Sequence, residues 1–151
     1  MCRFGLNTGA NRIGYLMAGI KFITILPLKN MRNTTLPKLL KKAQTVFNRF
    51  IRNRDQDLPC ICCGSYKTSD AGHYYSQGHH SALRFNEVNV NLCCRKCNSF
   101  LSGNLIHYRN GLIKKYTQQQ IDLLDSVGTR SPVKKWSRVE LEQIILRYQI
   151  S

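Results

Sequence analysis

The sequence predicts an α+β fold, in which a small core of two strands and a short helix is flanked by a basic helix before it and by further helices after it. Three observations indicate this arrangement. Two Cys-x-x-Cys pairs, Cys60–Cys63 and Cys94–Cys97, enclose a segment punctuated by glycine and turn residues. An amphipathic stretch precedes the first pair, and two helix-capping patterns follow the second. A chain of 151 residues suits one domain.

The first expected element is a basic helix over residues 37–53. Thr35 and Pro37 suit a helix start. Apolar side chains then recur at helical spacing: Leu39, Leu40, Ala43, Val46, Phe47, Phe50 and Ile51. Seven basic residues and no acid lie between residues 31 and 54, in a chain of net charge +15. This excess favours a polyanionic partner, because neutralised phosphates release condensed counterions. A solvated basic surface is the alternative, and charge alone does not separate DNA from RNA or an anionic membrane.

The middle segment is expected to form two strands and a helix. The strands fall around residues 70–75 and 82–92, and the helix begins near residues 94–98 and stops at Gly103 and Asn104. Thr117–Gln120 and Ser137–Glu140 then fit the capping-box pattern, which predicts two further helices. The apolar residues that follow each box are expected to be core.

Residues 1–36 are expected to be an N-terminal extension of unclear function, and residues 37–150 one domain. Residues 13–28 are rich in apolar side chains, but Lys21 interrupts them and they fall short of the roughly 20 residues of a membrane-spanning helix. No convincing cleavable signal follows. The chain is therefore expected in the cytoplasm, with no membrane partner and with reduced thiols that can bind a metal.

The cysteine pairs predict a structural Zn²⁺ held by Cys60, Cys63, Cys94 and Cys97. Cys62 and Cys93 are adjacent alternatives, but only the first choice keeps a two-residue gap in both zinc knuckles, 60–63 and 94–97. A shell of four sulfurs leaves no open position, so this ion would support the fold and do no chemistry. The competing interpretation is a set of ordinary thiols.

The order of His73, Asn89 and Asn98 around the knuckles resembles the HNH nucleases of the ββα-metal fold. Across residues 40–148 the chain more closely resembles the phage NinG (Rap) recombination endonucleases. The segments that carry this resemblance are Asp57-Leu58-Pro59-Cys60, Asp70-Ala71-Gly72-His73-Tyr74, Leu83-Arg84-Phe85-Asn86-Glu87, Ser102-Gly103-Asn104-Leu105 and Trp136-Ser137 with Glu140. The resemblance implies a metal-dependent, structure-selective endonuclease that hydrolyses phosphodiesters in branched DNA, such as Holliday junctions and D-loops, during phage recombination.

Phosphodiester hydrolysis needs an activated water and charge stabilisation, which assigns roles to the three residues. His73 is the expected general base, because imidazole titrates near neutrality. Asn98 is the expected ligand of a catalytic Mg²⁺ or Mn²⁺, and Asn89 is expected to clamp the loop between the strands. HNH enzymes often carry Asp directly before the histidine, where this chain has Gly72. Asp70 is the candidate replacement ligand, with a turn-capping role as the alternative.

Six basic residues are expected to contact DNA: Arg49, Arg52, Arg54, Arg84, Arg95 and Lys96. His79 and His80 are interpreted as loop residues, and His107 as a half-exposed helix residue. Symmetric incision of a junction would suit a homodimer. Two other functions remain open at this stage: a site-specific HNH duplex endonuclease, and a zinc-stabilised nucleic-acid-binding protein without catalysis.

Overall fold

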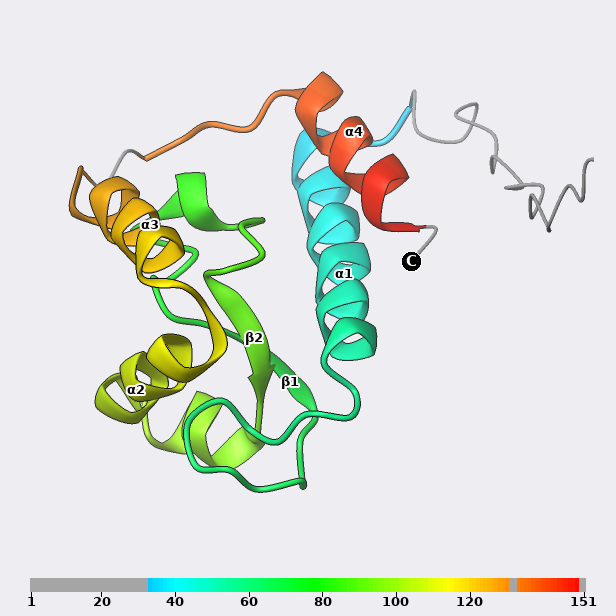
Figure 1. Cartoon of the computed structure of the whole chain (residues 1–151). Coiled ribbons are helices and arrows are strands. Elements are labelled where there is room, and N and C mark those ends of the chain that lie inside the picture. The colour runs from blue at the N-terminus through cyan, green and yellow to red at the C-terminus, as the bar shows by residue number, and fades with distance from the viewer. Residues whose placement is uncertain (1–32, 131–132, 150–151) are drawn as a thin grey trace, which may run out of the picture.

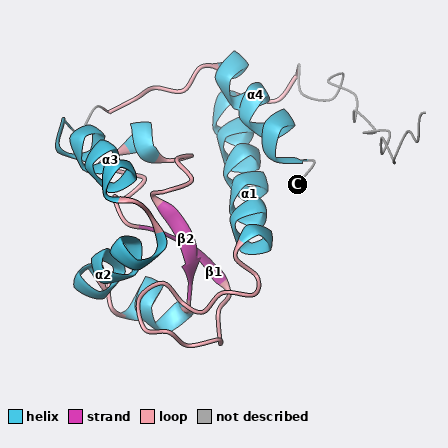
Figure 2. Ribbon diagram, in the orientation of Figure 1, coloured by secondary structure: helices cyan, strands magenta, loops and turns pink. Residues whose placement is uncertain are grey.

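The computed structural model describes residues 33–130 and 133–149, in which helices surround one two-stranded sheet (Figure 1, Figure 2). The elements in chain order are α1 (Leu36–Arg54), β1 (Asp70–His73), the 3-10 turn η2 (Ser81–Leu83), β2 (Val90–Cys93), the π-turn η3 (Lys96–Phe100), α2 (Leu105–Lys115), α3 (Gln118–Arg130) and α4 (Arg138–Gln149). The predicted α+β class is confirmed. Most of the predicted extension, residues 1–32, lies outside the described part, as does the apolar stretch 13–28. Among the described residues, no helix combines the length and apolar character that a membrane crossing requires.

The sheet is antiparallel, and its register places Asp70 opposite Cys93 and His73 opposite Val90. The strand predicted over 82–92 was too long, because only residues 90–93 belong to β2. The Asn86 side chain explains the difference. Its carbonyl oxygen accepts the N–H groups of Val88 and Asn89, both at 2.9 Å, and so holds the chain in a turn where a strand was expected.

Helix α1 matches the basic helix predicted over 37–53, and it lies beside α4 although the two are distant in sequence (Figure 1). Leu39, Phe47 and Ile51 of α1 are fully buried, as are Leu141 and Ile145 of α4. These side chains form a core cluster on one side of the sheet. The amphipathic pattern of α1 is therefore satisfied by a partner about a hundred residues later.

A second core cluster joins α2 and α3 to the cysteine-rich segment. Its largest side chains are Tyr108, Leu112 and Ile121, all fully buried. His107 was predicted to lie on a helix, but the bounds of α2 were not predicted. Three of its apolar residues are exposed: Leu105, Ile106 and Ile113. The apolar residues of α2 therefore do not recur at the regular helical spacing that marks a buried face.

Both predicted capping boxes are confirmed. Gln120 Oε1 accepts the backbone N–H of Thr117 at 3.0 Å, and Thr117 Oγ1 accepts the N–H of Gln120 at 3.3 Å. Glu140 Oε2 likewise accepts the N–H of Ser137 at 2.9 Å. Each pair satisfies donors that a helix start leaves open.

Asp55 ties three elements together where α1 ends. Its carboxylate accepts hydrogen bonds from Arg54 Nε at 2.8 Å and from the Leu92 N–H of β2 at 3.2 Å, and it pairs with Lys115 Nζ of α2 at 2.7 Å. Burial raises the pKa of Asp55, but the hydrogen bonds from Arg54 and Lys115 outweigh it and leave the pKa below its ordinary value. The carboxylate is therefore charged at neutral pH, and it holds α1, β2 and α2 in place around the cysteines.

Candidate functional site

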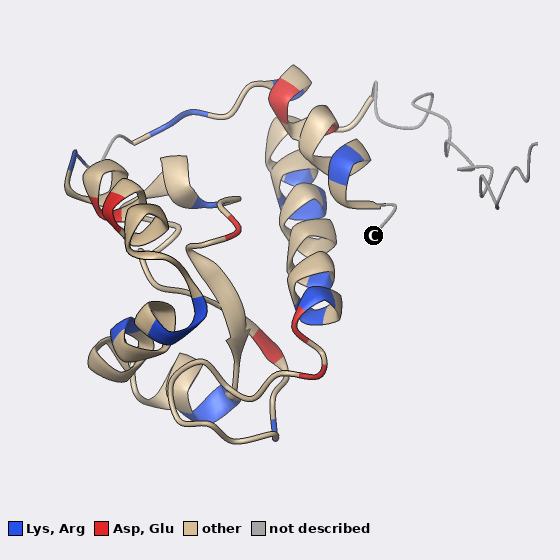
Figure 3. Ribbon diagram, in the orientation of Figure 1, with Lys and Arg blue, Asp and Glu red and all other residues tan. Residues whose placement is uncertain are grey.

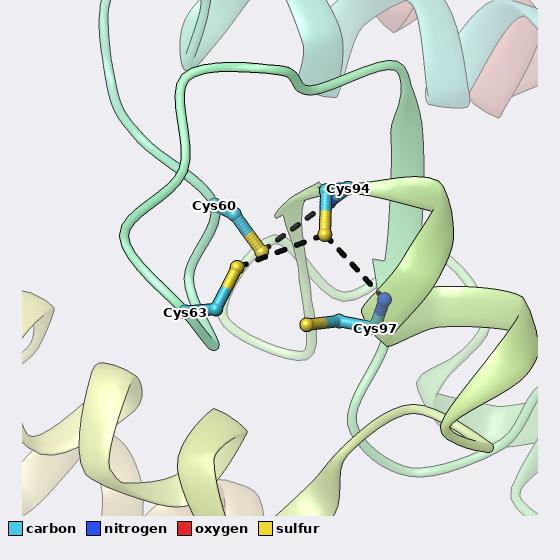
Figure 4. A group of neighbouring side chains, drawn as sticks. All are labelled: Cys60, Cys63, Cys94 and Cys97. Carbon is cyan, nitrogen blue, oxygen red and sulfur yellow. Dashed lines mark hydrogen bonds between the residues drawn. The ribbon is translucent and has the colours of Figure 1, made fainter.

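Four cysteine sulfurs gather at one end of the sheet (Figure 4). Cys60 and Cys63 come from the loop after α1, Cys94 directly follows β2, and Cys97 lies in η3. All four sulfurs lie within 4.8 Å of one another, and Cys63 Sγ lies 3.7 Å from Cys94 Sγ. A tetrahedral ion with metal–sulfur bonds of about 2.3 Å has sulfur–sulfur edges of about 3.8 Å. The cluster could therefore hold a metal ion, and zinc suits its ligands.

Backbone N–H groups point at these sulfurs, as a thiolate requires. Cys94 donates to Cys60 Sγ at 3.3 Å, and Cys97 donates to Cys94 Sγ at 3.4 Å. Burial raises the pKa of Cys60, but backbone donors outweigh it and lower the pKa to about 6. Burial raises the pKa of Cys97 to about 12, with the neighbouring sulfurs adding to the effect. Without a cation the four thiols would not all lose their protons at neutral pH.

An open pocket of about 410 Å³ lies beside the sheet, and His73 and Asn98 both line it. His73 ends β1, whereas Asn98 lies in η3, directly after the last cysteine of the cluster. The other lining residues are Asn48, Ala71, Ser76, Gln77, Ser102 and Gly103. The fold thus brings together two of the three residues assigned catalytic roles from the sequence.

The hydrogen bond of His73 fixes the tautomer of its ring. His73 Nε2 lies 3.1 Å from the carbonyl oxygen of Arg84. A carbonyl only accepts, so Nε2 carries the proton and Nδ1 of the neutral ring keeps a lone pair. Burial lowers the pKa of His73, the hydrogen bond to Arg84 opposes this, and the Arg84 charge lowers the pKa further. The ring is therefore neutral at pH 7, with one basic nitrogen.

Asn89 lies just before β2, at the end of the segment that connects the two strands, and it is fully buried. Its Nδ2 donates to the carbonyl oxygens of Tyr75 at 3.0 Å and Leu83 at 3.1 Å, and its Oδ1 accepts the Tyr75 N–H at 2.8 Å. These bonds join the residues that follow His73 to those that precede Arg84. Asn89 does not line the pocket, and its contacts make it a positioning residue.

Asp70 and Asn98 meet next to Gly72. Asn98 Nδ2 donates to Asp70 Oδ2 at 3.0 Å. Burial raises the pKa of Asp70, but the hydrogen bonds from Asn98 and Ser69 outweigh it, aided by the charges of Arg95 and Arg52, and the net pKa is lowered.

A Cβ atom at Gly72 would lie 3.0 Å from Cys93 Cβ and 3.1 Å from Asn98 Oδ1. Both approaches are tighter than ordinary contacts. A side chain at this position would therefore press on the amide of Asn98. This close approach explains the glycine, and the carboxylate that contacts Asn98 is that of Asp70.

The six basic residues predicted to contact DNA fall into two groups. Lys and Arg residues recur along α1 (Figure 3). Arg49 of this helix is exposed and Arg52 is half-buried, whereas Arg95 and Lys96, beside the cysteines, are both exposed. Arg54 and Arg84 have internal partners. Arg54 pairs with Asp55 and donates to the carbonyl oxygens of Glu87 and Val90. Arg84 donates to the side chains of Gln44 and Gln77.

The other histidines lie outside the pocket lining. His79 is exposed, and the ring of His80 lies 4.9 Å from that of Tyr75. His107 is exposed on α2, where a half-exposed position was predicted, and its Nδ1 lies 2.9 Å from Asn104 Oδ1.

Two residues near the pocket, Tyr108 and Asn48, were not predicted from the sequence. Tyr108 is fully buried, and its hydroxyl donates a hydrogen bond to the Gly72 carbonyl oxygen of β1 at 2.8 Å. This bond connects α2 to β1. Nothing in an apolar helix pattern distinguishes such a hydroxyl from an ordinary core residue. Asn48 is a pocket-lining residue on α1, and its polar position within an amphipathic helix was the only available signal.

The family model and the curated relatives that match this chain all carry the same name, ninG. A family described as "Bacteriophage Lambda NinG protein" matches residues 28–151. "Protein ninG" of Escherichia phage lambda is 42% identical over 112 residues, which cover 73% of this chain and 53% of that protein. "Protein ninG" of Salmonella phage P22 is 40% identical over 112 residues, which cover 73% of this chain and 54% of that protein. The chain spans about half the length of these relatives. No solved structure matches.

Proposed function

The chain belongs to the NinG family, and we propose that it is a metal-dependent, structure-selective endonuclease that hydrolyses phosphodiesters in branched DNA during phage recombination. Holliday junctions and D-loops are the proposed substrates, and the cytoplasm of a bacterial host is the proposed location. The observation that carries the proposal is one pocket lined by both His73 and Asn98. The order β1, β2 and η3 around the cysteine cluster supports a zinc-stabilised ββα-metal core of the HNH type.

His73 would act as the general base. Its Nδ1 lone pair takes the proton of a water molecule while the water oxygen bonds to phosphorus and the bond to the 3′ oxygen breaks. The carbonyl of Arg84 keeps the ring oriented and the proton on Nε2. The lowered pKa of His73 keeps the base uncharged at neutral pH. Asn89 keeps the loop that supplies this carbonyl at a fixed distance from β1.

Asp70 and Asn98 would hold the catalytic Mg²⁺ or Mn²⁺. A carboxylate and a carboxamide oxygen are hard ligands of the kind that these ions prefer. Asn98 Nδ2 lies 3.0 Å from Asp70 Oδ2, so a rotation of this amide would bring its oxygen beside the carboxylate. A bound ion would stabilise charge on the phosphate and on the departing oxygen. Zinc at Cys60, Cys63 and their two partners would fix the turn that carries Asn98.

The exposed cations would bind the DNA backbone. Arg95 and Lys96 lie between two of the cysteines, and the charges of Arg95 and Arg52 act on Asp70. Arg49 of α1 is a further exposed cation. Contacts of this kind give affinity without sequence readout, so binding should weaken steeply with salt. A homodimer would place two such sites across a junction.

A cleavage assay on branched DNA tests the proposal. Wild-type protein with Mg²⁺ or Mn²⁺ should cut four-way junctions and D-loops faster than linear duplex of the same sequence. His73→Ala should lower the rate by about 10²–10⁴-fold, the usual contribution of a general base. The matched control is His107→Ala, which removes an exposed histidine from α2 and should leave the rate unchanged.

Two further measurements separate the alternatives. His73→Ala should keep its zinc and its affinity for junction DNA, because neither depends on the base. If wild-type protein binds junctions tightly and leaves them intact with either ion, the chain is a non-catalytic binding protein. If it cuts linear duplex at a defined sequence as readily as junctions, it is a site-specific duplex enzyme.

A further inference from the structure

Two cysteines that the four-sulfur cluster does not use, Cys62 and Cys93, lie against it. We propose that they form a second metal site with Cys60, which would bridge two Zn²⁺ ions as a shared thiolate. The sulfurs of Cys60, Cys62 and Cys93 all lie within 4.8 Å of one another. Cys60 is thus common to both groups of sulfurs.

The distances within this trio suit a tetrahedral shell. Cys62 Sγ lies 3.5 Å from Cys93 Sγ, and Cys60 Sγ lies 3.8 Å from Cys93 Sγ. The expected sulfur–sulfur edge around zinc is about 3.8 Å. Cys63 Sγ and Cys94 Sγ, in the first site, are 3.7 Å apart. The second group is therefore spaced like the first.

The backbone supplies a fourth ligand. The carbonyl oxygen of Gly103 lies 3.6 Å from Cys62 Sγ. For bonds of about 2.3 Å to sulfur and 2.0 Å to oxygen, a tetrahedral sulfur–oxygen edge is about 3.5 Å. Gly103 has a φ of +89° and follows Ser102, whose φ is +48°. This left-handed turn directs a loop carbonyl toward Cys62, and a bound ion would offset the strain of Ser102.

Burial and charge favour a second ion. Cys93 is 0% exposed and Cys62 is 9% exposed, so the site excludes bulk water. Two more thiolates alone would add negative charge to a buried cluster, at a high cost. A second Zn²⁺ with two more thiolates leaves the net charge of the cluster unchanged, because the two charges of the ion balance the two thiolates. Sulfur donors also select zinc over the hard cations.

Metal stoichiometry tests the site without any activity measurement. The full chain is prepared in reductant with excess zinc, freed of unbound metal, and examined by native mass spectrometry and elemental analysis. We expect two zinc ions per chain in wild type and one in Cys62→Ser and Cys93→Ala. The matched control Cys2→Ser should keep two. Cobalt titration should show two steps of thiolate-to-metal absorption, and Cys62→Ser should remove one of them.

Several outcomes would overturn the proposal. One zinc per chain in fully loaded wild type would do so whether or not the variants fold. Two ions that persist in both Cys62→Ser and Cys93→Ala, or that fall to one in Cys2→Ser, would place the second ion elsewhere. A Cys62–Cys93 disulfide in protein prepared in reductant, seen as a loss of two hydrogens in mass, would replace the metal site by a covalent crosslink.

Discussion

Replacing Asp55 with Asn should destabilise the protein strongly, because one buried carboxylate joins α1, β2 and α2. The substitution keeps the size of the side chain and removes its charge. Arg54 and Lys115 would then face an amide in place of a carboxylate. An amide has one acceptor oxygen where the carboxylate has two, so the Leu92 N–H and the two cations would compete for it. Asp55 is 2% exposed, so water would not replace the lost partner.

The magnitude follows from the exposure of the partners. Breaking a buried ion pair by removing one member costs about 3–5 kcal/mol. The Arg54 and Lys115 side chains are each 22% exposed and can recover some hydration. We therefore expect the lower end, about 3 kcal/mol in the free energy of unfolding, and a fall of about 10 °C in the melting temperature. Urea unfolding followed by circular dichroism measures the first, and calorimetry the second.

The effect should depend on pH in a defined direction. The pKa of Asp55 in the folded protein lies below its ordinary value of 3.8. A lowered carboxyl pKa stabilises the fold above the unfolded value, and this contribution is lost as pH falls through the folded value. The difference in unfolding free energy between wild type and Asp55→Asn should therefore be largest at pH 7. It should shrink once the pH falls below about 4, as Asp55 takes up a proton.

Asp57 supplies the matched control, because it is an exposed acid two residues further along the chain. Asp57→Asn should change the unfolding free energy by less than about 0.5 kcal/mol. An unfolding free energy of Asp55→Asn within about 1 kcal/mol of wild type would contradict this role of Asp55. So would a stability difference between the two proteins that did not narrow in acid.

Three other predictions concern the pocket and the cysteines. Asn89→Ala removes the partners of a part-buried Tyr75 N–H and of two carbonyl groups, so it should lower the free energy of unfolding in urea by about 2–3 kcal/mol and slow junction cleavage with zinc retained. An unchanged unfolding midpoint would contradict the positioning role of Asn89. NMR titration should place the pKa of His73 below 6.5, and cleavage should rise with pH through that pKa and then level off. A pKa above 6.5 would be incompatible with burial as the dominant cause. Chelation of zinc should remove hydrogen-exchange protection from residues 60–63 and 90–97, and unaltered protection would show that the cysteines do not need a metal.

The sequence predicted most reliably where one residue type has one physical role. Thiolate pairs need a fixed gap to reach one ion, so the spacing of Cys60 and Cys63 indicated the cluster that the structure contains. The apolar period of residues 37–53 likewise indicated α1, because an exposed stripe of that width is unfavourable. The meeting of His73 and Asn98 was indicated by family resemblance, since neither periodicity nor composition relates residues on different elements.

The remaining features depend on tertiary contacts that a local pattern does not contain. Asn86 folds a strand-like segment into a turn through its own side chain. The expectation that Arg54 contacts DNA rested on charge alone. Charge does not indicate that its guanidinium donates to the carbonyl oxygens of Glu87 and Val90, more than thirty residues away. The start of α2 is set by left-handed residues ahead of it, and its buried face by Tyr108 and Leu112.

The pairing of α1 with α4 makes the order of synthesis matter. A ribosome adds about 5–20 residues per second, so roughly 4–17 s separate the end of α1 at Arg54 from the start of α4 at Arg138. During that interval Leu39, Phe47 and Ile51 lack their contacts with α4, although Phe85 and the sheet can already pack against the helix. The nascent chain would offer chaperones a basic helix with a partly uncovered apolar stripe. A chain that stops before residue 138 would leave that part of the stripe uncovered for the life of the product.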